Sequence, residues 1–143
     1  MQQMKNIRGE FTRPDSTFRF WINQESEIFK PDSGRYHIYI SLACPWAHRT
    51  MIVANLKGLR DHITFSVVHP TWQRTKPESD EHCGWVFRNP EDPSVSSIQG
   101  FGSFDCEGCI PDYINQTKTV RELYEKCGGT TGRYSVPILW DKK

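Results

Sequence analysis

The sequence lacks several features that would assign the protein to a specialised class. No apolar stretch approaches the roughly 18 residues that a membrane-spanning helix needs. The formal net charge of +1 indicates no basic surface for nucleic acid or for an anionic membrane. The polar N-terminus contains no apolar segment typical of a secretory signal. We therefore expect a cytoplasmic protein that binds neither nucleic acid nor a membrane.

Internal repeats and low-complexity tracts are also absent, and 143 residues suffice for one domain with a hydrophobic core. Residues 1–33 show no sustained apolar periodicity, although they contain several aromatic side chains. We interpret residues 1–33 as an ordered N-terminal arm over the domain, with room for one short helix. Residues 34–143 form the predicted domain.

A second closely spaced cysteine pair is missing too. Five cysteines, an odd number, without a secretory signal indicate free thiols in a reducing compartment. Cys106 and Cys109 form a CxxC pair, but a tetrahedral zinc site would have to recruit Cys83 and Cys127 from distant positions. We therefore predict no metal site. Cys106 and Cys109 are interpreted as incidental thiols, with a redox dithiol as the alternative.

Apolar periodicity predicts an α/β fold. A strand, a helix and a second strand in succession form a βαβ unit, whose two strands should be parallel. A long excursion rich in proline, serine and glycine follows, and such loops are often functional. The predicted elements in chain order are strand 35–40, helix 45–58, strand 62–68, excursion 69–104, helix 110–126 with a stop near Cys127, and strand 135–140.

Cys44 is the candidate reactive residue. It stands between the first predicted strand and the helix, where free backbone N–H groups and the helix dipole favour a thiolate. Pro45 suits the first helical turn, because its missing N–H has no helical acceptor there. His48 and Arg49 could add positive potential. The alternative is a buried structural cysteine.

Three stretches carry a family resemblance. The run SLACPWAHRT at 41–50, the run GWVF at 84–87 and the run GRYSVPILWD at 132–141 resemble the glutathionyl-hydroquinone reductases, also called Xi-class glutathione transferases. The matches span residues 34–143, and the CPWAHR core is their most specific part. The resemblance implies the thioredoxin-like fold of a glutathione transferase N-terminal domain.

The same resemblance implies a glutathione site. Cys44 would be the catalytic nucleophile, and Val136 before a cis Pro137 would pair its backbone with the cysteinyl part of glutathione. Trp85 would pack on glutathione, and Arg133 would pair with its carboxylates. From the residues alone, Pro137 could instead mark an edge strand, Trp85 a core anchor and Arg133 a solvated surface.

The implied reaction is glutathione-dependent reduction of a glutathionyl-hydroquinone through a mixed disulfide between Cys44 and glutathione. Two alternatives stay open. One is a thioltransferase like the omega class or glutaredoxin, and the other is an inactive binding module. Partners would be glutathione, as co-substrate, and a glutathionylated hydroquinone.

The chain departs from the family pattern after residue 141. The family continues with another strand, a helix that grips the glutamyl end of glutathione, and an all-helical domain that forms the homodimer. We therefore expect a domain truncated before its last strand and helix, with the C-terminal helical domain absent.

Overall fold

The computed structural model describes residues 16–129 and 133–143. Contacts divide the chain into two units, Met1–Pro31 and Asp32–Lys143. In the first unit, the described residues 16–31 form turns and contain no helix. Residues 1–15 of the predicted arm lie outside the described residues, and its boundary at residue 33 stays a prediction.

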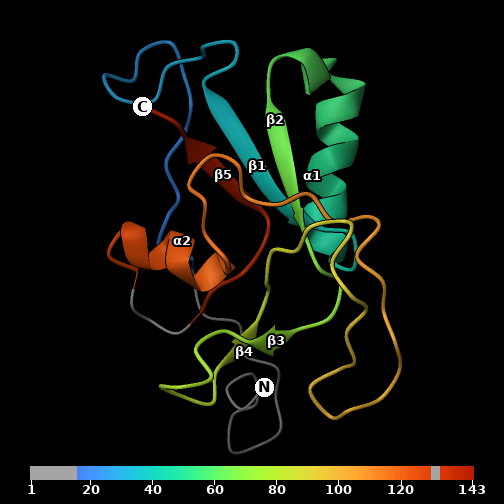
Figure 1. Ribbon diagram of the computed structural model, residues 1–143. Helices are drawn as coiled ribbons and strands as arrows, with labels where there is room; N and C mark the ends of the chain where they lie inside the picture. Colours follow the sequence, from blue (N-terminus) through green and yellow to red (C-terminus); the bar gives the residue numbers. More distant parts are fainter. Residues whose placement is uncertain (1–15, 130–132) are drawn as a thin grey trace, which may run out of the picture. The chain divides into compact units, whose positions relative to one another are not determined.

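A three-stranded sheet organises the second unit (Figure 1). Strand β1 (Tyr36–Ser41) lies between β2 (Thr64–Val68) and β5 (Ile138–Asp141). The β1–β2 pair is parallel and the β1–β5 pair is antiparallel. All six residues of β1 are buried, as expected for a central strand covered on both faces. The predicted parallel βαβ unit is therefore confirmed.

Helix α1 (Pro45–Leu56) joins β1 to β2 and lies beside both strands (Figure 1). It ends two residues before the predicted limit, and Gly58, with a φ of +65°, leads into the short 3-10 helix η1 (Leu59–Asp61). A positive φ suits glycine because it has no Cβ. The inner face of α1 presents Ala47 and Ala54 to the core. Its outer face leaves four large apolar side chains exposed: Trp46, Ile52, Val53 and Leu56.

The predicted helix over 110–126 is wrong in its first part. Helix α2 spans only Val120–Lys126, because the buried Asp112 carboxylate organises the preceding residues into turns. Its oxygens accept hydrogen bonds from the backbone N–H groups of Ile114, Asn115 and Thr117. They also accept the Thr117 hydroxyl at 2.6 Å and the Tyr39 hydroxyl of β1 at 2.7 Å. An aspartate that bonds its own following backbone competes with helix formation.

The start of α2 is fixed by a reciprocal cap. Thr119 Oγ1 accepts a hydrogen bond from Glu122 N at 3.2 Å, and the Glu122 carboxylate accepts one from Lys118 N at 2.9 Å. The first bond satisfies a backbone donor that the first helical turn cannot pair, and the second holds the residue before the N-cap Thr119. The helix ends at Lys126, with Cys127 as its C-cap residue before Gly128, near the stop that the sequence predicts.

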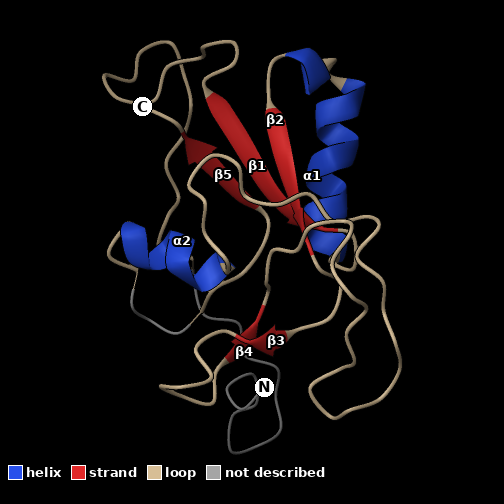
Figure 2. Ribbon diagram, viewed as in Figure 1, coloured by secondary structure: helices blue, strands red, loops and turns tan. Residues whose placement is uncertain are grey.

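The excursion between β2 and α2 is mostly loop, drawn in tan in Figure 2. It contains the short antiparallel strands β3 (Gln73–Arg74) and β4 (Cys83–Gly84), which periodicity did not predict. The last strand also differs from the prediction of 135–140. It starts three residues later, at Ile138, because Pro137 has no N–H for a strand ladder.

Asp112→Ala should destabilise the domain by about 3 kcal/mol, because it leaves several buried donors without an acceptor. Urea unfolding followed by tryptophan fluorescence measures this free energy. Asp105→Ala is the matched control, since Asp105 is exposed and accepts one backbone hydrogen bond. Equal stability of the two variants would contradict the structural role of Asp112.

The stability of the domain should fall with acidification below pH 6.5. His37 is fully buried, its ring nitrogens bonded to Thr64 and Ser66, and burial lowers its pKa from 6.5 to about 4. Between pH 6.5 and about 4, His37 binds a proton in the unfolded chain but not in the folded one. The free energy of unfolding therefore falls by about 2–3 kcal/mol over this range.

Urea unfolding at several pH values between 4 and 7 measures this loss, which His37→Gln should reduce. His62→Gln is the control, because His62 is exposed. An unchanged pH dependence in His37→Gln would rule out His37 as its source.

Candidate functional site

Cys44 lies at the junction of β1 and α1, as predicted. Ser41 closes the turn: its carbonyl accepts a hydrogen bond from Cys44 N at 3.1 Å, and its Oγ accepts one from Ala43 N at 3.2 Å. Cys44 is the N-cap residue of α1, but its side chain makes no capping bond. The half-buried thiol therefore sits at the positive end of the helix dipole, where negative charge is stabilised.

The structure brings Cys44 together with Val136. The Cys44 thiol donates a hydrogen bond to the Val136 carbonyl, with a distance of 3.6 Å from Sγ to O. The sheet explains this meeting. Strand β5 runs antiparallel to β1 with Ile138 opposite Tyr39, so Val136 falls beside the end of β1 that leads into Cys44. The peptide bond between Val136 and Pro137 is cis, as the resemblance implies.

Trp85 directly follows β4 and is half-buried against the hydrophobic core. Its ring meets Trp72 edge-on, with 5.6 Å between ring centroids. Its carbonyl accepts a hydrogen bond from Val120 N at 3.1 Å, which ties it to the start of α2. The core-anchor interpretation therefore has direct support, and contact with glutathione stays a prediction.

Arg133 is exposed, and within the described residues it has no hydrogen-bond or ion-pair partner. The next residue, Tyr134, is fixed by three side chains that sequence reasoning did not connect with it. It packs edge-on against His82 and Tyr124, with centroid distances of 5.1 and 5.6 Å, and the Arg121 guanidinium lies 5.6 Å from its ring. Tyr134 thus anchors the backbone between Arg133 and the cis peptide.

A network of ion pairs holds the Arg121 side chain in place. Its guanidinium pairs with Asp80 at 2.7 Å and with Glu125 at 2.8 Å, and Lys76 also pairs with Glu125 at 2.8 Å. Lys76 and Arg121 together hold the pKa of Glu125 below its usual range. The spacing from Arg121 to Glu125 could have indicated one of these pairs from the sequence, because residues four apart face each other on a helix.

His48 and Arg49 are exposed on α1. The Arg49 guanidinium lies 4.1 Å from the centre of the Trp46 ring, a cation–π contact on the helix surface. His48 bonds to Cys44 through the backbone of the helix, from its N–H to the Cys44 carbonyl at 3.0 Å. Neither contact gives evidence that His48 or Arg49 acts as an acid or a base.

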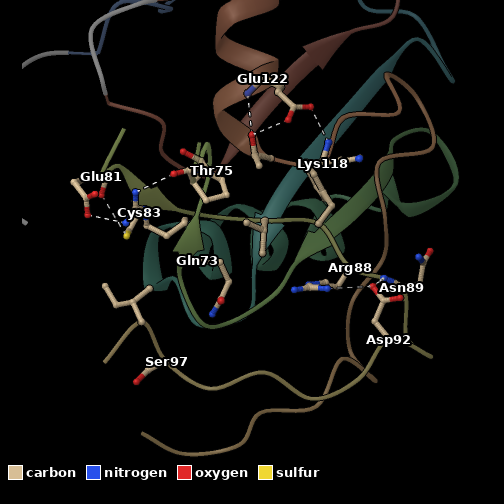
Figure 3. A pocket seen from close by; sticks show the side chains of 16 residues that line it. Gln73, Thr75, Glu81, Cys83, Arg88, Asn89, Asp92, Ser97, Lys118 and Glu122 are labelled. Atoms are coloured by element: carbon tan, nitrogen blue, oxygen red, sulfur yellow. Dashed lines mark hydrogen bonds and ion pairs between the residues drawn. The ribbon is translucent and has the colours of Figure 1, made fainter. Parts of the chain in front are cut away.

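A cavity of about 1050 Å³ lies between β3, β4, the following loop and the start of α2 (Figure 3). Within the described part of the chain, its lining includes none of the five predicted site residues. Charges of both signs line it, with Arg88 and Asp92 3.9 Å apart. This mixture favours no single ligand charge, and the Cys44 junction remains the stronger candidate site.

The other cysteines form no metal site in the part of the chain that the structure describes. No group of three or more histidine, cysteine or acidic side chains is placed to hold a metal ion there. The zinc alternative that combined Cys83, Cys106, Cys109 and Cys127 is therefore unsupported.

Across the same residues, no helix has both the length and the apolar character needed to cross a bilayer.

A protein-family model described as the N-terminal domain of glutathione S-transferase matches residues 43–143. The chain belongs to this family. The predicted thioredoxin-like fold of a glutathione transferase N-terminal domain is thereby confirmed, and the matched region contains Cys44 and all four predicted glutathione-contacting residues.

Individual proteins similar to this glutathione S-transferase domain include members of the family that the sequence resembles. The glutathionyl-hydroquinone reductase YqjG of Escherichia coli (strain K12) is 35% identical over 147 residues, which cover 97% of this chain and 38% of the relative. The crystal structure of the glutathione S-transferase Xi from Phanerochaete chrysosporium is 39% identical, with a TM-score of 0.68, and the match covers 92% of this chain and 37% of that one.

A third relative is the Xi glutathione transferase ECM4 from Saccharomyces cerevisiae, solved in complex with glutathione. It is 32% identical with a TM-score of 0.71, and the match covers 93% of this chain and 41% of that one. The resemblance to glutathionyl-hydroquinone reductases and Xi-class transferases is therefore confirmed. The chain spans only about two fifths of the length of these relatives.

Proposed function

We propose that this chain carries the glutathione site of a glutathionyl-hydroquinone reductase, with Cys44 as its nucleophile. The observation that supports the proposal most directly is the contact between the Cys44 thiol and the Val136 carbonyl, beside the cis peptide. It joins two segments that are 92 residues apart, each from a motif of the family resemblance.

Glutathione would bind along the Val136 backbone like an added strand, with its sulfur toward Cys44. Pro137 would hold that backbone toward the ligand, and Trp85 would pack on the bound peptide. Arg133 would pair with a carboxylate through its planar guanidinium, and its exposed side chain is available for this role. Support comes from the yeast relative that was solved with glutathione.

The reaction would proceed in two steps. The Cys44 thiolate attacks the sulfur of the glutathionyl-hydroquinone, the bond between that sulfur and the ring carbon breaks, and the ring carbon takes up a proton to give the free hydroquinone. This leaves a disulfide between Cys44 and glutathione. A second glutathione thiolate then attacks the glutathione sulfur, which releases glutathione disulfide and regenerates the Cys44 thiolate.

Cys44→Ser should abolish turnover of a glutathionyl-hydroquinone, lowering the rate by at least about 1000-fold, because a serine hydroxyl cannot form the mixed disulfide. Hydroquinone release measured by liquid chromatography tests this. Cys127→Ser is the matched control, since Cys127 is an exposed thiol at the end of α2.

A mixed disulfide of glutathione with a small thiol should be offered in parallel to separate the alternatives. Reduction of this substrate without hydroquinone release would favour the thioltransferase. Binding of glutathione without either reaction would favour the inactive module. Equal rates for the original chain and Cys44→Ser would contradict the proposal.

Arg133→Ala should weaken glutathione binding by about 10-fold, or ~1.4 kcal/mol, because it removes a charged partner for a carboxylate. Isothermal titration with glutathione measures the change. Arg60→Ala serves as the control: Arg60 lies in η1, stacked on Phe65 at 4.2 Å. An equal effect of both substitutions would point to net charge rather than to a specific contact.

A further inference from the structure

Two buried thiols lie outside the proposed glutathione site. The Cys106 and Cys109 side chains are 1% and 3% exposed, and the proposed reaction uses neither. Their backbones are joined by a hydrogen bond from Cys109 N to the Cys106 carbonyl at 2.8 Å, which closes a four-residue turn. The two ends of such a turn lie less than about 7 Å apart between Cα atoms. Most disulfides fall within this separation.

The two thiols also interact with each other. Burial, together with the charge and hydrogen bonding of Cys106, raises the pKa of Cys109 to about 11. The Cys106 thiol donates a hydrogen bond to the Pro93 carbonyl, with 3.7 Å between Sγ and O. Both thiols therefore belong to one turn and are shielded from solvent.

Neighbouring contacts hold this turn in place. Directly after it, Ile110 exchanges two backbone hydrogen bonds of 2.9 Å with Val67 of β2. On its other side, Leu42 lies against Gly108: a Cβ at Gly108 would be 3.6 Å from Leu42 Cδ1. Leu42 belongs to the loop that leads into Cys44. The turn that carries the two thiols is thus held between β2 and the loop that leads into Cys44.

We propose that Cys106 and Cys109 are a reversible dithiol–disulfide couple that low-molecular-weight disulfides oxidise. In the first step the Cys106 thiolate attacks one sulfur of glutathione disulfide, forms a mixed disulfide and releases one glutathione. In the second step Cys109 loses its proton to solvent and attacks the Cys106 sulfur, which releases the second glutathione. Two protein thiols are oxidised to one disulfide, and one glutathione disulfide is reduced to two glutathione molecules.

The surroundings predict that the mixed disulfide is short-lived. Cys109 stands beside the attacked sulfur, and a glutathione adduct on a 1% exposed side chain has no room in the folded turn. Access requires local opening of the loop that precedes the turn. Within residues 88–105 this loop has one isolated β-bridge, between Val95 and Phe104, and otherwise mainly short-range hydrogen bonds within turns. The disulfide between Cys106 and Cys109 should therefore form before the glutathione adduct accumulates.

Mass spectrometry of tryptic peptides tests this directly. The full chain is equilibrated with mixtures of glutathione and glutathione disulfide, and the remaining free thiols are then alkylated. Peptide 89–118 contains Cys106 and Cys109 and no other cysteine. With excess glutathione disulfide it should lose two hydrogen atoms and carry no alkyl group, and dithiothreitol should reverse the change.

Cys44→Ser should give the same result for peptide 89–118, so failure of the proposed reaction at Cys44 does not affect this test. Cys106→Ser and Cys109→Ser should abolish the two-hydrogen loss, whereas Cys83→Ser should leave it unchanged. A peptide that stays doubly alkylated at every ratio would overturn the proposal. So would stable glutathione adducts without the internal disulfide.

Discussion

The buried carboxylate of Asp112 is the interaction on which much of this domain depends. It accepts the Tyr39 hydroxyl from the central strand and, at the same time, organises the turn that ends at Thr117. Burial acts to raise the pKa of Asp112, but its hydrogen bonds together hold it below the usual value. The carboxylate therefore stays ionised and fully bonded inside the protein, a condition that makes a buried charge tolerable.

The turn that Asp112 organises also helps to position the candidate site. Directly after the Asp112 turn, residues 118–120 run beside residues 85–87. Phe87 N bonds to the Lys118 carbonyl at 2.8 Å, and Val120 N bonds to the Trp85 carbonyl at 3.1 Å. A carboxylate bonded to β1 thus fixes where Trp85 lies. The sheet itself fixes the other half of the site, because the β1–β5 register brings Val136 to Cys44.

Local patterns in the sequence were sufficient for the βαβ unit and for Cys44 at the start of its helix. These features depend on periodicity and on residues within one turn of each other. The role of Asp112 was not predictable in this way, because its partner Tyr39 lies 73 residues earlier. The same holds for Arg121, whose ion-pair partner Asp80 comes from a loop without a periodic pattern. That Cys44 and Val136 belong to one site was predictable from the family resemblance, but not from periodicity.

The central claim is that glutathione binds at the junction of Cys44 and Val136 rather than in the large cavity. Backbone amide chemical shifts of the ¹⁵N-labelled chain, titrated with glutathione, test it most directly. If glutathione binds at this junction, the largest shifts should fall on Val136, Trp85 and the residues around Cys44. Shifts concentrated on cavity residues such as Arg74, Arg88 and Lys118 would contradict it.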